Sequence, residues 1–169
     1  TPACIGLPEM AMVNERSFRL TGAELSFGAL GEADLAAMLD IERSGYGYPW
    51  SRAQFLDCMG EGFDAWGCFL GEQLVGYLIH WQVLDEAHLM NLCVHRSYAR
   101  QGIGRQLLRH WIARMISQRM GELTLEVRHS NRAAQDLYRS EGFVQVGMRP
   151  DYYPDAGERE SAIIMKLTL

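Results

Sequence analysis

The sequence has no tract of basic residues, no apolar run of 18 residues and no paired-cysteine motif. Its net charge is −5 and its isoelectric point is near 5.5, so it lacks the positive surface that nucleic-acid binding requires. Because it has neither a membrane-length apolar run nor a basic leader, we expect a cytoplasmic protein without membrane contact. The acidic balance suits a cationic partner, such as an amine or a basic peptide.

The cysteines and histidines lack the spacings that common metal sites use. Cys4, Cys58, Cys68 and Cys93 form no C-x-x-C pair, so neither a zinc site nor a disulfide framework is predicted. None of the five histidines follows another at the four-residue spacing of a helical metal pair. Cys93 precedes His95, which would lie on the same strand face, but no third group to orient that pair is evident for a nucleophilic role. We expect reduced thiols, core packing for Cys93 and no metal.

Length and composition predict one folded domain with a short extension. A chain of 169 residues with 48% hydrophobic content can form one core, and no linker rich in proline or glycine divides it. Residues 1–17 start without Met, and Pro8 and Glu9 interrupt their apolar residues, so we expect an unmatched extension or an expression remnant. Residues 18–169 are expected to form a single domain. Strands around a tight turn at Gly71-Glu72, together with helical segments, predict a mixed α/β fold with a largely antiparallel sheet.

The most informative stretch is an apolar strand that runs into a polar loop and then directly into a helix. It reads Leu92-Cys93-Val94-His95-Arg96-Ser97-Tyr98-Ala99-Arg100-Gln101-Gly102-Ile103-Gly104-Arg105. Amide groups at a helix start lack intrahelical acceptors, and the helix dipole adds positive charge, so we predict a phosphate or pyrophosphate there. Gly102 and Gly104 let the main chain approach a ligand closely. The loop is no P-loop, because Arg105 replaces the required lysine, and two glycines are too few for the dinucleotide fingerprint.

The residues after this loop continue the α/β pattern. Apolar residues recur at helical spacing at Ile103, Leu107, Leu108, Trp111, Ile112, Met115 and Ile116. Alternation then predicts a strand over residues 122–128, with Glu126 on its polar face. A second helix is predicted from Ser130, as the N-cap, to a C′ glycine at Gly142, followed by a strand over residues 143–146.

Taken together, these segments resemble the GCN5-related N-acetyltransferases (GNAT family), and within them the RimI-like group that acetylates ribosomal-protein N-termini. The resemblance runs from about Phe18 to the C-terminus. It is carried by the glycine loop and by Pro49-Trp50-Ser51, Asp85 to Asn91, Leu125 to Arg128 with Ser130-Asn131, Leu137-Tyr138 with Gly142-Phe143, and Arg149 to Pro154 through Ala162 to Met165. It implies the GNAT fold, a mixed, mostly antiparallel twisted sheet flanked by helices, and acetyl-CoA as the cosubstrate.

The resemblance also implies roles for individual residues. Glu126 would be the general base and Tyr138 the general acid, and Asn131 would touch the coenzyme. Leu92, Cys93 and Val94 would offer main-chain groups to the pantetheine arm. The diphosphate would lie on the loop made of Arg100, Gln101, Gly102, Ile103, Gly104 and Arg105. Ala99 departs from the family, which usually has Gln or Arg there, and this change should weaken coenzyme contact without changing the coenzyme.

The acceptor implied by the resemblance is the N-terminal alanine of small-subunit ribosomal protein eighteen. Pro49, Trp50, Tyr152 and Tyr153 would form an aromatic slot for it. A set of acids near the C-terminus could attract a basic peptide, although ordinary solvated acids explain them equally well: Asp151, Asp155, Glu158 and Glu160.

Four alternatives stay open at this point. Glu126 could be a solvated residue paired with Arg128 on the same strand face, and Tyr138 could merely pack beside Leu137. The enzyme could act on a small amine, such as a polyamine or an aminoglycoside. The chain could also be a non-catalytic acyl-CoA-binding module, although the presence of both Glu126 and Tyr138 argues against that.

Overall fold

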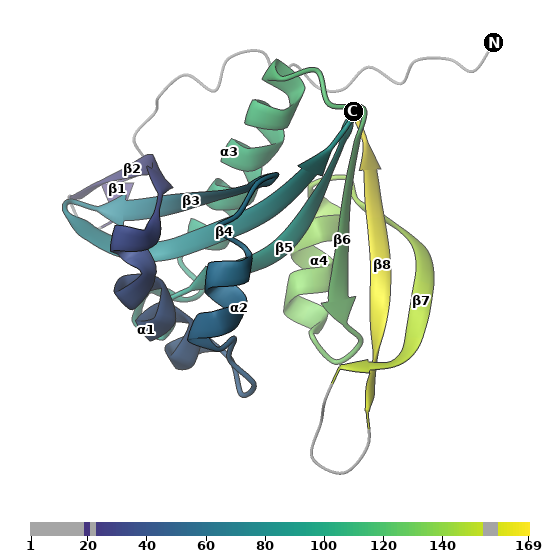
Figure 1. The fold of residues 1–169 in the computed structure, drawn as a ribbon, viewed down its shortest axis with the longest axis horizontal. Helices are drawn as coiled ribbons and strands as arrows, with labels where there is room; N and C mark the ends of the chain where they lie inside the picture. Colours follow the sequence, from purple (N-terminus) through teal and green to yellow (C-terminus); the bar gives the residue numbers. More distant parts are fainter. Residues whose placement is uncertain (1–18, 21–22, 154–158) are drawn as a thin grey trace.

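A computed structural model describes residues 19–20, 23–153 and 159–169 (Figure 1). The predicted extension, residues 1–17, lies outside these residues. In chain order the elements are β1 (Arg19–Leu20), β2 (Ala23–Leu30), α1 (Leu35–Gly45), α2 (Arg52–Asp57), β3 (Phe63–Leu70), β4 (Gln73–Val83), β5 (Glu86–Val94), α3 (Ile103–Ser117), β6 (Glu122–Arg128), α4 (Arg132–Ser140), β7 (Val144–Tyr153) and β8 (Glu160–Thr168). Short 3₁₀ turns at Glu32–Asp34 and Arg96–Tyr98 precede α1 and α3.

The described strands form one mixed sheet, which confirms the predicted fold class. Its order is β1-β2-β3-β4-β5-β6-β8-β7. Neighbouring strands run antiparallel except β5 and β6, which are parallel and are joined through α3. The predicted turn between β3 and β4 is present, and Gly71 adopts the positive φ of 61° that glycine tolerates best.

The central parallel pair of strands stays together for only part of its length. β5 pairs with β6 from Glu86 to Leu89, opposite Glu122 to Leu125. Beyond that point the two strands diverge, and Figure 1 shows β5 and β6 spreading apart from a shared end. This leaves the second half of β5 and the end of β6 facing one another across a gap in the ladder.

A β-bulge in β5 decides which side chains reach this region. Ile79 of β4 pairs with Asn91, and His80 pairs with Leu89, so Met90 has no residue opposite it. The extra residue reverses the alternation of faces. Leu89 and Leu92 therefore both pack toward α3, whereas Met90 and Asn91 both lie on the α1 side.

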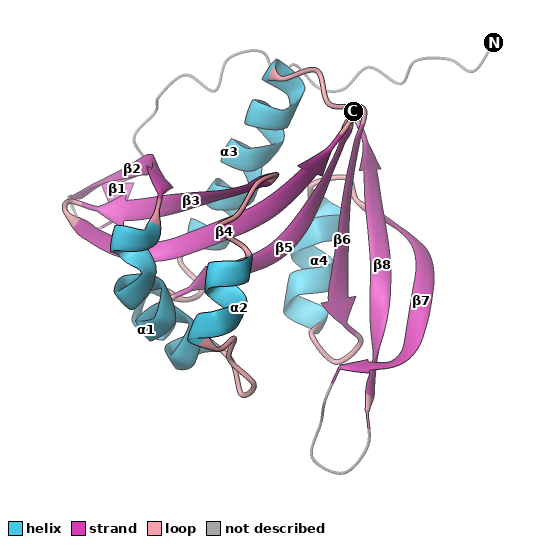
Figure 2. Cartoon of the chain, in the orientation of Figure 1, coloured by secondary structure: helices cyan, strands magenta, loops and turns pink. Residues whose placement is uncertain are grey.

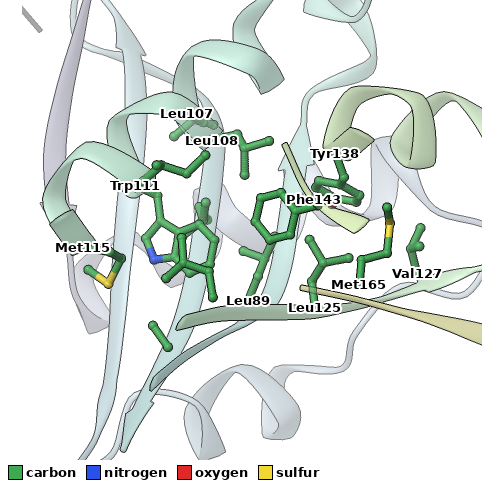
Figure 3. Packing of buried hydrophobic residues seen from close by; sticks show 14 of the residues in the cluster. Leu89, Leu107, Leu108, Trp111, Met115, Leu125, Val127, Tyr138, Phe143 and Met165 are labelled. Atoms are coloured by element: carbon green, nitrogen blue, oxygen red, sulfur yellow. The ribbon is translucent and has the colours of Figure 1, made fainter. Parts of the chain in front are cut away.

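Helices cover both faces of the sheet, with α1 and α2 on one face and α3 and α4 on the other (Figure 2). The larger core cluster lies under α3, whose predicted apolar positions are buried except Ile116, which is 42% exposed. Figure 3 shows Leu107, Leu108, Trp111 and Met115 of α3 packed over the sheet, with Tyr138 beside Phe143. The second cluster places α1 against Phe55, Tyr77 and Cys93.

The start of α4 differs from the prediction by one residue. The N-cap is Asn131 rather than Ser130, because the Asn131 side chain accepts a hydrogen bond from the Ala134 amide at 3.1 Å. At the other end Gly142 has φ 97°, as expected for a C′ glycine. The strand predicted over residues 143–146 is longer than expected, because β7 continues to Tyr153 along the edge of the sheet.

Candidate active site

A cleft of about 910 Å³ opens where β5 and β6 diverge. Its walls come from α1, the loop before α2, β5, β6, α4 and the end of β7. The cleft brings together eight of the predicted site residues: Pro49, Trp50, Leu92, Glu126, Asn131, Tyr138, Tyr152 and Tyr153. Residues far apart in the sequence thus share one pocket, which is the geometry that a two-substrate reaction needs.

Glu126 projects from β6 at the edge of this cleft, and its side chain is 11% exposed. Its Oε1 atom lies 2.7 Å from Nε of Arg149, which comes from β7. The Tyr152 hydroxyl hydrogen-bonds to the same carboxylate. Arg128, the partner considered from sequence, forms an ion pair of 3.3 Å with Glu160 of β8. Glu126 is therefore a nearly buried carboxylate held in a defined orientation.

Tyr138 lies in α4, borders the cleft and is 7% exposed. Its ring packs edge-on against Phe143 with centroids 5.9 Å apart (Figure 3). Burial raises the pKa of Tyr138 well above its ordinary value, and Tyr153 adds a smaller upward contribution. The phenol thus stays protonated and can donate a hydrogen bond. Core packing, which the sequence left open as an alternative to the acid role, is therefore present at this residue together with contact with the cleft.

The main chain at the start of α3 has the conformation expected of an anion site. Gly102 is the N-cap, with φ 83° and ψ 1°. The first intrahelical hydrogen bond runs from the Gln106 amide to the Gly102 carbonyl, so the amides of residues 103–105 have no acceptor within the helix. Of the two loop glycines, only Gly102 has a positive φ. A Cβ atom on Gly104 would meet Val94 and Leu137 at ordinary distances, 3.7 and 3.9 Å.

The charged side chains of this loop have different surroundings. Arg105 donates to Glu141 and to the Ser140 hydroxyl, which ties α3 to the end of α4. Arg109 binds the other oxygen of Glu141 at 2.8 Å. Arg100, with φ 64°, and Gln101 are exposed. The loop borders α4 through Gly104 and Leu137, and Leu137 also lines the cleft.

The three predicted β5 residues do not share one environment. Leu92 lines the cleft, and its carbonyl oxygen accepts a 2.6 Å hydrogen bond from the Tyr46 hydroxyl. Cys93 points the other way, with Sγ 3.7 Å from the Ile41 carbonyl, and burial raises the pKa of its thiol. Val94 packs against the α3 cluster. The buried Cys93 thiol therefore fits core packing, as expected.

The predicted acceptor slot lies between the loop before α2 and the end of β7. Trp50 packs edge-on against Phe55 at 5.5 Å. Tyr153 lies under the Arg128 guanidinium at 4.5 Å, and burial together with Glu126 raises the pKa of Tyr153 to about 12. Of the four acids considered from sequence, Asp151 is exposed and Glu160 is paired with Arg128. Asp155 and Glu158 lie outside the described residues.

Sequence reasoning missed several polar residues of this site, and three of them have contacts that bear on its chemistry. His88 lines the cleft and lies 2.7 Å from the Thr124 hydroxyl, and burial lowers its pKa. Arg149 binds Glu126, and Glu42 is buried in the α1 wall. His88 has no spacing signal of its own. The Arg149 contact crosses β8, so only the strand order could have revealed it.

The cleft therefore offers a carboxylate and a protonated phenol to a reacting group, and the predicted loop residues 100–105 do not themselves line it. The amides at the start of α3 can hold an anion beside Leu137, which borders both the loop and the cleft. Within the described ranges, no three His, Cys, Asp or Glu side chains gather as metal ligands would. No helix in the part of the chain that the structure describes is both long and apolar enough for a membrane span.

Comparison with known proteins agrees with this geometry. Residues 35–143 match the family described as "Acetyltransferase (GNAT) family". The [ribosomal protein bS18]-alanine N-acetyltransferase of Escherichia coli K12 is 39% identical over 144 residues, which are 85% of this chain and 97% of that protein.

Solved structures give the same result. The crystal structure of the ribosomal-protein-S18-alanine N-acetyltransferase from Escherichia coli has a TM-score of 0.82 and 39% identity, covering 85% of this chain and 93% of that one. Arabidopsis thaliana NAA60, solved with a bisubstrate analogue, has a TM-score of 0.76 over 85% of this chain and 97% of its own. At 17% identity, that second likeness shows the fold alone.

Proposed function

The chain belongs to the acetyltransferase (GNAT) family, and on that premise we propose that it acetylates the N-terminal α-amine of a protein, in the first place the N-terminal alanine of ribosomal protein bS18. The protein is an acetyl-CoA-dependent N-acetyltransferase of the RimI-like kind. The observation that carries the acceptor assignment is 39% identity over 97% of a relative named for that reaction. The reaction would take place in the cytoplasm, where a ribosomal protein is made.

Glu126 is proposed as the general base. An N-terminal α-amine has a reference pKa of about 7.7–8.0, so a carboxylate suffices to take its proton near neutral pH. The ion pair with Arg149 supports this role because it fixes the orientation of the Glu126 carboxylate. Oε1 faces Arg149, and the second oxygen is then available to accept the proton from the amine. Tyr152 would give up its hydrogen bond to Glu126 as the amine arrives.

Tyr138 is proposed as the general acid. The amine nitrogen forms a bond to the acetyl carbon while the bond from that carbon to sulfur breaks. The amine proton passes to Glu126, and the departing thiolate takes a proton from the Tyr138 hydroxyl. The raised pKa of Tyr138 means that the phenol is protonated before the reaction and can donate a hydrogen bond to the departing sulfur.

The coenzyme end of the site is proposed to lie at the start of α3. Acetyl-CoA, when bound, supplies the activated acetyl carbonyl and two linked phosphates. The amides of residues 103–105 would hold the phosphates, with Arg100, Gln101 and Gly102 shaping the loop. Leu92, next to the gap between β5 and β6, would offer main-chain groups to the pantetheine arm. Asn131 uses its side-chain oxygen to cap α4 and keeps its NH₂ group for the coenzyme.

The acceptor would enter between the loop before α2 and the end of β7. Pro49 and Trp50 of that loop and Tyr152 and Tyr153 of β7 all line the cleft. The net charge of −5 supports a basic acceptor. Direct transfer needs no acyl-enzyme, and the buried, high-pKa thiol of Cys93 is unsuited to forming one.

The test is an acceptor panel. The protein is incubated with acetyl-CoA and one of three acceptors: a basic peptide beginning with alanine, the same peptide with its N-terminus already blocked, or free polyamines and aminoglycosides. Thiol release gives the rate, and mass spectrometry locates the acetyl group. We expect one acetyl group on the alanine α-amine and none on the blocked peptide. Turnover of the small amines without turnover of the alanine peptide would exclude the proposal.

A further inference from the structure

Glu42 is a buried carboxylate that the chemistry proposed above does not use. It lies in α1, is 1% exposed, and its side chain contributes to the cleft wall. A buried charge is costly unless hydrogen bonds compensate for the lost water. Its partners therefore show what the fold uses it for.

Both oxygens of Glu42 accept hydrogen bonds from other elements. Oε1 accepts the backbone N–H of Trp50 at 2.9 Å. Oε2 accepts the Tyr77 hydroxyl of β4 and the Asn91 side-chain amide of β5, the latter at 3.2 Å. Asn91 also donates to the Tyr77 oxygen at 3.1 Å. One carboxylate thus joins α1, two central strands and the loop that carries Trp50.

The contact with Trp50 is the one that reaches the acceptor side. Residues 46–50 form the wall between α1 and α2, and Tyr46 ties its beginning to β5 through the Leu92 carbonyl. Glu42 ties its end through the Trp50 amide. The wall is therefore fastened at both ends to strand β5, either directly or through the Glu42–Asn91 bond.

We propose that Glu42 is a positioning residue for the acceptor: its carboxylate holds the Trp50 amide, and thereby sets the wall against which the incoming N-terminus lies. The inference rests on the proposed function, because it assigns the Trp50 wall to the acceptor. Glu42 itself makes no hydrogen bond to Leu92 or to the start of α3, where the coenzyme is proposed to bind. Loss of the Glu42 carboxylate should therefore weaken binding of the acceptor peptide and leave binding of acetyl-CoA unchanged.

The first experiment separates the two substrates kinetically. Glu42→Gln keeps the side-chain shape but leaves one oxygen for three donors. We expect the KM for the alanine peptide to rise at least ~10-fold, equivalent to about 1.4 kcal/mol, with an unchanged KM for acetyl-CoA. Glu122→Gln is the matched control, because Glu122 pairs with Lys166 at 2.7 Å and does not line the cleft. It should change neither constant.

The second experiment observes the contact without turnover. Amide hydrogen exchange is followed at Trp50 and, as a reference, at Gln106, whose amide donates to the Gly102 carbonyl at the start of α3. In the unaltered protein the Trp50 amide should be protected, and in Glu42→Gln its exchange should speed up at least ~10-fold while Gln106 stays the same. If the Trp50 amide of the unaltered protein exchanges as fast as in a free peptide, the proposal is overturned. This measurement does not depend on whether the Glu42→Gln variant folds.

Two other outcomes would also contradict it. An unchanged peptide KM in Glu42→Gln would remove Glu42 from acceptor positioning. If the KM values for the peptide and for acetyl-CoA rise equally, and the Trp50 and Gln106 amides both exchange faster, Glu42 is only a general stabiliser of the core. If the unaltered protein acetylates no peptide, the proposed function fails, and the exchange comparison still decides whether Glu42 fixes the wall.

Discussion

Replacing the two glycines at the start of α3, Gly102 and Gly104, with alanine should change the free energy of unfolding in opposite directions. Gly102 has φ 83°, and a Cβ atom there would meet nothing within 4 Å. Gly104 lies in the first turn of α3, and a Cβ atom there would rest against Val94 and Leu137 at 3.7 and 3.9 Å. The effect at Gly102 therefore comes from backbone conformation, and the effect at Gly104 comes from helix propensity.

The expected magnitudes follow from these conformations. An alanine forced into the left-handed region costs about 1–2 kcal/mol, so Gly102→Ala should lower the free energy of unfolding by that amount. An alanine in place of a helical glycine contributes about 0.5–1 kcal/mol, so Gly104→Ala should raise it. For a chain of this length, each kcal/mol shifts Tm by about 2–4 °C, so the Tm values of the two variants should differ by about 3–12 °C.

The assays are chemical and thermal unfolding of the ligand-free protein, followed by calorimetric titration with coenzyme A. Gly102→Ala should weaken coenzyme A binding about 10-fold, or 1.4 kcal/mol, because it shifts the amides that hold the phosphates. Gly104→Ala should leave that Kd unchanged, because its new methyl group faces Val94 and Leu137. The reasoning is refuted if Gly102→Ala keeps both full stability and full affinity, or if Gly104→Ala destabilises the protein by more than ~1 kcal/mol.

Three further outcomes are expected. Glu126→Gln should lower kcat by about 10²–10⁴-fold with an unchanged Kd for coenzyme A, and unaltered turnover in steady-state assays would remove Glu126 from the mechanism. Tyr138→Phe, which deletes only the hydroxyl of a packed ring, should lower kcat by a similar factor while Tm, measured by calorimetry, stays within a few degrees; full activity would exclude the acid role. Burial lowers the pKa of His80 from 6.5 to about 4, so below pH 6.5 the unfolded chain takes up a proton that the folded one refuses. The free energy of unfolding should then fall as pH decreases from 6.5 to 4, by at most about 1.4 kcal/mol per pH unit. In His80→Gln, the plot of unfolding free energy against pH, measured by chemical denaturation, should be flatter over this range. Parallel plots for the two proteins would contradict this.

The sequence predicted the elements whose signals are local. The apolar spacing of α3, the alternation of β6, the Gly71 turn and the C′ glycine at 142 all depend on residues close in the chain, and each is present. The N-cap of α4 was misplaced by one residue because Ser130 and Asn131 are both good caps, and only the contact with the Ala134 amide distinguishes them.

Long-range partners could not be read from the sequence. Arg149 reaches Glu126 across β8, so that pairing depends on β8 being inserted between β6 and β7. Glu42 reads as one polar residue near the end of an amphipathic helix, and its burial depends on Tyr77 and Asn91 from two other strands. The β-bulge at Met90 turns Asn91 toward α1. The order of polar and apolar residues in β5 does not identify Met90 as the extra residue, so the bulge could not be predicted from the sequence.

The most direct test of the account is a structure of the protein with bound acetyl-CoA. We expect the two linked phosphates on the amides of residues 103–105 and the thioester sulfur within hydrogen-bond reach, about 3.5 Å, of the Tyr138 hydroxyl. Phosphates bound away from the start of α3, or a sulfur far from both Tyr138 and Glu126, would contradict it.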